Sequence, residues 1–183
     1  KTLTSDGASQ SVVSTNVVIQ STAVDPTNAR QVSVELPTPT GSSTSTVAAA
    51  VPSEVFVNVP KNGEFARVNV IQYTQSPFPT QNTINTTLAS VVVSIAIADA
   101  NGGAFSISNL QTPINITVPL VQPLAAGEIQ TDETKSGFRL QCRYWDTTNN
   151  VWSSSGVTTN SFSSTSTSCA TRHLTNFAVF KVY

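Results

Sequence analysis

Short segments rich in Val, Ile, Ser and Thr recur along most of this 183-residue chain, and turn-forming residues separate them. β-branched residues favour extended backbone, whereas Pro, Asn, Asp and Gly end strands or reverse the chain. No segment repeats its apolar residues at helical spacing, so the parallel crossovers that helices make are excluded. The segments that we predict to be strands are residues 11–22, 30–37, 48–60, 67–74, 90–99, 104–110, 114–120, 138–146 and 174–183.

Strands at intervals of roughly ten residues favour an antiparallel β-sandwich, with a partly open barrel as the alternative. Asn101-Gly102-Gly103 predicts a tight hairpin between two of them. The chain is long enough for one sizeable core but short for two ordinary domains. We therefore predict an all-β fold in a single domain that spans residues 1–183.

The composition limits the partners of the chain. Charged residues make up 10% of the sequence, against about a quarter in ordinary domains. The net charge is -1 and the sequence has no run of Lys or Arg. These values exclude recognition of nucleic acid or of an anionic membrane surface. A polar surface made mostly of Ser and Thr is typical of extracellular rather than intracellular domains.

Three features of the sequence bear on how the chain is cut from a larger protein and glycosylated. Residues 1–10 are polar, with no signal peptide, and no apolar run approaches the length of a membrane span, so we expect a domain excised from a larger protein. Sequons at Asn85 and Asn115 are candidate N-glycosylation sites. The Pro/Ser/Thr-rich residues 37–47 predict a loop open to O-glycosylation, or a weak boundary.

Cys142 and Cys169 are the only cysteines. An even number of cysteines in a chain of extracellular composition predicts one disulfide, and two free buried thiols are the alternative. Closing a loop of this length stabilises a fold by roughly 3 kcal/mol. A metal site is not expected, because one His and two Cys lack the paired spacing of zinc ligands.

His173 is the only histidine, and it lies two residues before Thr175 at the start of an apolar run. On this pattern alone, a surface or capping histidine is the expected interpretation and a catalytic one is the minor alternative.

The order of residues around His173 resembles the GPS motif, which ends the GAIN domain of adhesion G-protein-coupled receptors and polycystin-type membrane proteins. The resemblance covers residues 142–178, and the strand-rich body before them is similar in character to the β-sandwich half of the GAIN domain, known as subdomain B. The helical half has no counterpart in this sequence. The positions that match the motif are Cys142, Tyr144, Trp145, Trp152, Gly156, Cys169, His173, Leu174, Thr175, Phe177 and Ala178.

Two positions depart from the motif. Val157 and Thr171 stand where the family has its second and fourth cysteines. The family pairs the first cysteine with the third and the second with the fourth. The resemblance therefore implies that a Cys142–Cys169 bridge is kept and that the other bridge is lost whole.

The resemblance also implies a reaction, in which the chain cuts itself once between Leu174 and Thr175. A Thr hydroxyl needs a base to become a nucleophile, and His173 is near enough in sequence to supply one. The acyl group of Leu174 moves from nitrogen to the Thr175 oxygen, and water then hydrolyses the ester. This is a single-turnover reaction of the chain on itself, for which we expect neither a cofactor nor a metal.

After the cut, we expect the C-terminal strand from Thr175 to Tyr183 to stay bound. Alternation places Phe177 and Val179 on one face and Ala178 and Phe180 on the other, so both faces can be covered. The resemblance implies a position on the extracellular side of the cell surface, with a membrane-embedded region after Tyr183 in the parent protein.

Two further hypotheses remain. The chain is either a GAIN-like sandwich that no longer cleaves, or an adhesive or structural domain of an extracellular glycoprotein. The sequence identifies no external ligand and no group to stabilise the oxyanion of the reaction.

Overall fold

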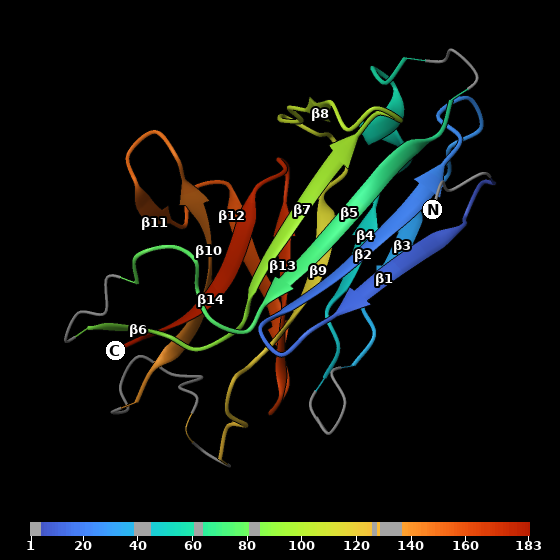
Figure 1. Cartoon of the computed structure of the whole chain (residues 1–183). Helices are drawn as coiled ribbons and strands as arrows, with labels where there is room; N and C mark the ends of the chain where they lie inside the picture. Colours follow the sequence, from blue (N-terminus) through green and yellow to red (C-terminus); the bar gives the residue numbers. More distant parts are fainter. Residues whose placement is uncertain (1–4, 39–44, 61–63, 81–84, 126–127, 129–136) are drawn as a thin grey trace.

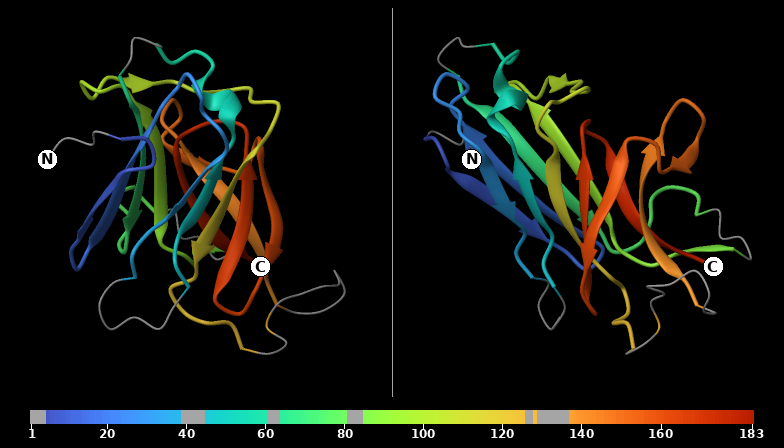
Figure 2. Two further views of the ribbon diagram at one scale, coloured as in Figure 1. Left: turned by 90° about the vertical axis from the view of Figure 1, so that its right-hand side faces the viewer. Right: turned by 180° about the vertical axis from the view of Figure 1, so that it is seen from behind.

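The computed structural model describes residues 5–38, 45–60, 64–80, 85–125, 128 and 137–183, and its strands form two sheets that face each other (Figures 1 and 2). Every strand pairing among these residues is antiparallel. The only helical element among them is a short 3-10 turn, η1 (Ser53–Phe56). The predicted all-β sandwich, with no helical half in the described residues, is therefore confirmed.

The larger sheet contains the C-terminal strand near its middle. Its spatial order is β1 (Ser9–Val13), β2 (Val17–Val24), β5 (Ala66–Tyr73), β7 (Val92–Ala98), β14 (Asn176–Val182), β10 (Arg139–Asp146) and β11 (Val151–Ser153). Two short strands lie off this path, where β6 (Thr86–Leu88) pairs with β14 and β8 (Ala104–Phe105) pairs with β7. β14 thus has hydrogen-bonded neighbours on both of its edges.

The smaller sheet covers one face of the larger one. Its spatial order is β12 (Val157–Phe162), β13 (Ser166–Thr171), β9 (Ile114–Pro119), β4 (Ala48–Val51) and β3 (Val32–Glu35).

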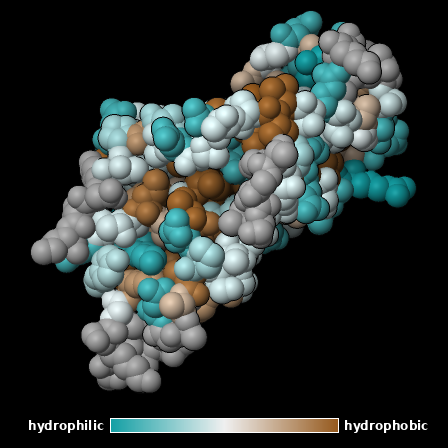
Figure 3. Space-filling model, turned by 60° about the horizontal axis from the view of Figure 1, so that its bottom comes forward, coloured by the Kyte–Doolittle hydropathy of each residue, from teal (hydrophilic) through white to brown (hydrophobic). Residues whose placement is uncertain are grey.

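The main core lies between the two sheets and follows from alternation along the strands. In β5, Ala66, Val68 and Val70 are buried while Arg67 and Asn69 between them are partly exposed. Successive side chains of a strand point to opposite faces, so one face of each sheet enters the core. The outside is pale in Figure 3 over much of its area, as expected where Ser and Thr replace charged residues.

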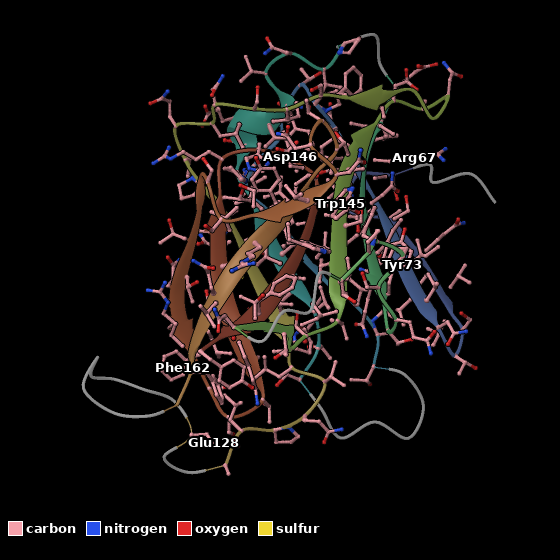
Figure 4. All side chains as sticks on the ribbon, turned by 90° about the vertical axis from the view of Figure 1, so that its left-hand side faces the viewer. Arg67, Tyr73, Glu128, Trp145, Asp146 and Phe162 are labelled. Atoms are coloured by element: carbon pink, nitrogen blue, oxygen red, sulfur yellow. A yellow bond between two sulfur atoms is a disulfide. The ribbon has the colours of Figure 1, made fainter. Side chains whose placement is uncertain are left out.

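A second apolar cluster lies on the outer face of the larger sheet. We call it the outer cluster, and its buried members are Val92, Trp145, Trp152, Ala178 and Phe180. Partly buried side chains that include Phe78 pack against it, and the indole of Trp152 donates a hydrogen bond to the Pro79 carbonyl oxygen at 3.2 Å. Figure 4 labels Trp145, a member of the outer cluster on β10, and Tyr73 of β5, which packs against this cluster.

Three predicted strands differ from the observed ones. Residues 11–22 form most of a hairpin of β1 and β2, because the amide and hydroxyl of Ser14 both bond the Val17 carbonyl oxygen. Residues 48–60 are a strand only to Val51, since Pro52 has no amide hydrogen and the chain then enters η1. The stretch 104–110 is a strand only at its first two residues.

Other predictions fall outside the described part or are confirmed. Residues 39–44, the middle of the loop predicted at 37–47, lie outside the described residues. The hairpin at 101–103 is confirmed, because Asp99 donates its amide hydrogen to the Gly103 carbonyl and Gly102 has a φ of 88°. Among the described residues, no helix is long and apolar enough to span a membrane.

Candidate functional site

The residues predicted to react lie in the turn that connects the two sheets. β13 ends at Thr171 in the smaller sheet, and β14 begins at Asn176 in the larger one. We call residues 172–175 the crossing turn, and it carries His173, Leu174 and Thr175. A crossing between packed sheets fixes both ends of such a short segment.

A disulfide fixes the sheets to each other close to this turn. It joins Cys142 of β10 to Cys169 of β13, with 5.9 Å between the two Cα atoms. Both cysteines are buried in the main core, and the Cys142 amide donates to the Thr159 hydroxyl at 2.9 Å. The bridge therefore links the last strand before the crossing turn to the strand beside β14.

His173 is half-buried against aromatic rings. Its ring lies edge-to-face on Tyr144, with 4.6 Å between centroids, and 5.9 Å from the ring of Phe177. Gly156 has a φ of 72°, and a Cβ atom there would lie 3.9 Å from Nε2 of His173. Burial lowers the pKa of His173 from its ordinary value of 6.5. The imidazole is therefore neutral at neutral pH, which is the form that accepts a proton.

Thr171 stabilises the first half of the crossing turn. Its hydroxyl donates to the His173 carbonyl oxygen at 3.2 Å and accepts from the His173 amide at 3.4 Å. Thr171 is also the direct cross-strand partner of Val157. The two positions without cysteines are thus neighbours in space, as the loss of one whole bridge requires.

The backbone on either side of the Leu174–Thr175 bond is held. The Leu174 amide donates to the Ile107 carbonyl oxygen, and the Thr175 carbonyl oxygen accepts from the Ile95 amide, both at 3.1 Å. In the described part of the chain, no hydrogen bond reaches the carbonyl of Leu174 or the amide of Thr175. The peptide unit between them is therefore anchored only through its neighbours.

The hydroxyl of Thr175 is hydrogen-bonded to a backbone carbonyl and not to the proposed base. It donates to the Trp145 carbonyl oxygen at 3.3 Å. Among the described residues, no hydrogen bond joins it to the His173 ring. This hydrogen bond to Trp145 must therefore break before the hydroxyl can give its proton to His173.

The structure divides the motif residues between two places. Tyr144, Gly156 and Phe177 gather around His173, whereas Trp145, Trp152 and Ala178 belong to the outer cluster. The sequence did not indicate Ile107, Ile95 or the Trp145 carbonyl, because backbone groups act there and any residue type supplies them. Both candidate glycosylation residues, Asn85 and Asn115, are exposed.

Comparison with known proteins gives one family. The family model described as GPS, GAIN subdomain B, matches residues 10–181. None of the curated proteins matches the chain.

The fold is similar to part of the solved full extracellular region of zebrafish Gpr126/Adgrg6. The TM-score is 0.65 at 24% sequence identity, over 93% of this chain and 23% of that one. The present chain thus spans less than a quarter of that protein's extracellular region, and the likeness concerns the fold.

Proposed function

This chain belongs to the GPS family as a GAIN subdomain B, and from that membership we propose that it cuts its own backbone once, between Leu174 and Thr175. The observation that carries the proposal is the crossing turn, which places a neutral imidazole and a hydroxyl on either side of one peptide bond. The residues from 1 to 183 act as one domain in this proposal.

The reaction needs two proton transfers and one water. His173 takes the hydroxyl proton of Thr175, whose oxygen attacks the carbonyl carbon of Leu174. The C–N bond then breaks, the Thr175 nitrogen receives the proton from His173, and an ester joins Leu174 to the Thr175 oxygen. Water hydrolyses this ester to a Leu174 carboxylate and a free Thr175 hydroxyl.

The surroundings of the turn favour this chemistry. The Cys142–Cys169 bridge and the anchored peptides on both sides restrict the motion of the reacting atoms. Restricting reacting groups in this way lowers the entropic part of a barrier. The Thr175 hydroxyl must still be released from the Trp145 carbonyl before it can react.

The cut chain keeps its last strand in this proposal. β14 pairs with β10 on one edge and with β7 and β6 on the other. Phe177 is buried in the main core and Phe180 in the outer cluster. A fully buried side chain of this size contributes about 1.5–3 kcal/mol, so the strand from Thr175 to Tyr183 is a stable partner of the body.

We further propose a location on the extracellular side of the cell surface. There the domain precedes a membrane-embedded region that follows Tyr183 in the parent protein. Asn85 and Asn115 are exposed, which supports N-glycosylation at both.

N-terminal sequencing of the purified chain tests the cleavage. A fragment that begins at residue 175 is expected from the wild type and from Thr175→Ser, which keeps the hydroxyl. His173→Ala and Thr175→Ala remain intact, because one lacks the base and the other the nucleophile. Intact wild-type chain after long incubation overturns the proposal.

A non-cleaving domain is the second candidate function. The hydrogen bond from the Thr175 hydroxyl to Trp145 favours it, because this bond engages the proton that His173 would have to take. Such a domain uses the same β14 as a permanent, uncut strand. The same sequencing experiment separates the two candidates.

A further inference from the structure

A loop far from the motif in sequence lies along the crossing turn. The Leu110 amide donates to the Arg172 carbonyl oxygen, and the Leu174 amide donates to the Ile107 carbonyl oxygen, both at 3.1 Å. Residues 107–110 therefore run beside residues 172–174 like a short irregular strand. This pairing explains why the predicted strand 104–110 leaves its sheet after Phe105.

Arg172 attaches this loop to the residue directly before His173. Its Nη1 atom donates to the Leu110 carbonyl oxygen at 2.6 Å and also to the carbonyl oxygen of Gln111. A guanidinium that reaches two carbonyls at once fixes their position better than a single-point contact does.

Glu54 of η1 holds the same loop from the other side. Its carboxylate accepts from the Gln111 amide at 2.7 Å through Oε1 and from the Thr112 amide at 2.9 Å through Oε2. The amides of Gln111 and Thr112, and then the charge of Arg172, hold the pKa of Glu54 below its ordinary value. The carboxylate is therefore ionised at neutral pH, as these charge-assisted bonds require.

Both backbone groups of Gln111 are thus hydrogen-bonded to charged side chains. Its amide is bonded to Glu54 and its carbonyl oxygen to Arg172. The contacts form a chain from η1 through the loop to the crossing turn, at the end of the sandwich that lies uppermost in Figure 1.

We propose that Glu54 and Arg172 are positioning residues for the cut between Leu174 and Thr175. This inference rests on the proposed self-cleavage. It adds two residues to the reaction. Glu54 lies outside the motif, and Arg172 lies within the motif at a position where the motif specifies no residue type. Neither side chain reacts, and both act by fixing the loop that anchors the Leu174 amide.

The test follows formation of the fragment over time in pulse-labelled, freshly synthesised full-length chain. Glu54→Ala is expected to slow the cut about tenfold or more, because small displacements of reacting groups have large effects on rate. Glu54→Gln keeps one acceptor oxygen and is expected to recover part of the rate. Arg172→Ala removes the one nitrogen, Nη1, that donates to both carbonyls, so its cut is also expected to be slowed.

Glu128→Ala is the matched control. Glu128 also accepts a backbone amide, from Ala125 at 2.7 Å, but it lies in another loop and is exposed where Glu54 is partly buried. The rate of fragment formation in Glu128→Ala is expected to equal that of the wild type. Wild-type rates for both Glu54→Ala and Arg172→Ala overturn the proposal.

Two additional measurements separate positioning from general loss of structure. Hydroxylamine intercepts esters, so it cannot rescue variants in which the acyl shift itself is slow, whereas it rescues a defect in hydrolysis alone. A rescue of Glu54→Ala to the wild-type rate therefore contradicts the proposal. The thermal midpoint of each variant identifies any that are simply unfolded.

Amide hydrogen exchange keeps the test valid if the wild type proves uncut. Glu54→Ala is then expected to accelerate exchange at Leu174 and Leu110 at least about tenfold, with other core amides unchanged. Faster exchange in Glu54→Ala, together with an uncut wild type, means that Glu54 does fix the loop beside the crossing turn and that the proposed self-cleavage is wrong. Unchanged exchange at both amides means that Glu54 does not fix this loop.

Discussion

His173 is the residue on which the proposed chemistry depends, and its environment determines when it can act. The imidazole lies against Tyr144 and Phe177 and is half-buried, which lowers its pKa from 6.5. Burial of this kind disfavours the charged form. A base that stays neutral below pH 6.5 works over a wider range than an exposed histidine does.

The pH dependence of cleavage follows from this shift. The rate is expected to be constant above about pH 7 and to fall about tenfold per pH unit once the pH is below the pKa of His173. The midpoint must lie below 6.5, since the pKa is lowered. Rates of fragment formation in buffers from acid to neutral pH give the midpoint, and Thr175→Ser should share it. A midpoint at or above 6.5 contradicts the assignment.

The same shift affects stability with a definite sign. The folded state binds the His173 proton more weakly than the unfolded state does, so stability is fully present above pH 6.5 and declines as the pH falls through the lowered pKa. His173→Phe, which keeps a ring in the pocket, is expected to remove this part of the decline in urea unfolding. If the free energy of unfolding depends on pH in the same way for both proteins, the expected pKa shift is contradicted.

The sequence indicates the side chains that we propose to react but not the groups that support them. His173, Leu174 and Thr175 could be singled out because the proposed chemistry needs specific side chains, and because their order resembles a known motif. The Ile107 carbonyl and the Glu54 carboxylate could not, because their roles arise from a loop that folds back over the crossing turn. Contacts of this type depend on three-dimensional position rather than on a local pattern.

At the scale of single elements, β14 is unusual in being apolar on both faces. Phe177 and Val179 enter the main core, while Ala178 and Phe180 enter the outer cluster. A strand in such a position contributes to two separate packing surfaces, so either face can be weakened independently.

Truncating either large side chain of β14 should be costly. Phe177→Ala and Phe180→Ala are each expected to lower the free energy of unfolding by about 3–5 kcal/mol, because each leaves a cavity. Urea unfolding measures the change. Thr158→Ala on the exposed face of β12 is the control, with a change within about 0.5 kcal/mol. A small effect for Phe180→Ala would mean that the outer cluster is loosely packed.

The second element-scale prediction concerns β12 and β13. Val157 and Thr171 face each other across these strands, so Val157→Cys combined with Thr171→Cys is expected to form a second disulfide. A bridge that closes a loop of this length stabilises by about 3 kcal/mol in the chain-entropy picture.

Thiol labelling of the unreduced, denatured double variant shows whether this bridge forms. Each single cysteine variant is the control, with one reactive thiol. Two reactive thiols in the double variant contradict the expected geometry. Loss of the Thr171 hydroxyl removes its contacts with the His173 backbone, so the rate of cleavage in the double variant also reports on that hydroxyl.

The strands differed in how readily the sequence revealed them. β5 and β7 could be predicted because β-branched apolar residues fill their buried positions. β13 was missed because its buried positions carry Thr167, Cys169 and Thr171, so no apolar alternation marks it. β12 was missed because it is an edge strand that is mostly exposed. Small polar residues such as Thr167 and Thr171 are buried only once the two sheets have packed together, so the sequence alone does not mark them as core positions.

For the whole molecule, we predict that a cut chain remains one particle. Native size-exclusion chromatography should show a single species near the mass of the intact chain, 19.3 kDa, because β14 is paired on both edges and buried on both faces. Denaturant should release a peptide that begins at Thr175. Thr175→Ala, which stays uncut, provides the reference elution volume. Loss of the peptide without denaturant contradicts the central placement of β14.

The disulfide lies wholly on the N-terminal side of the Leu174–Thr175 bond. A cut would therefore leave the final strand without any covalent attachment to residues 1–174, in oxidising and reducing surroundings alike. Its departure would require the two sheets to open around it, so its residence time would equal the waiting time for that opening. Adding free peptide of the same sequence would not shorten this time, because exchange would be limited by the unfolding rate of the sandwich and not by a binding equilibrium.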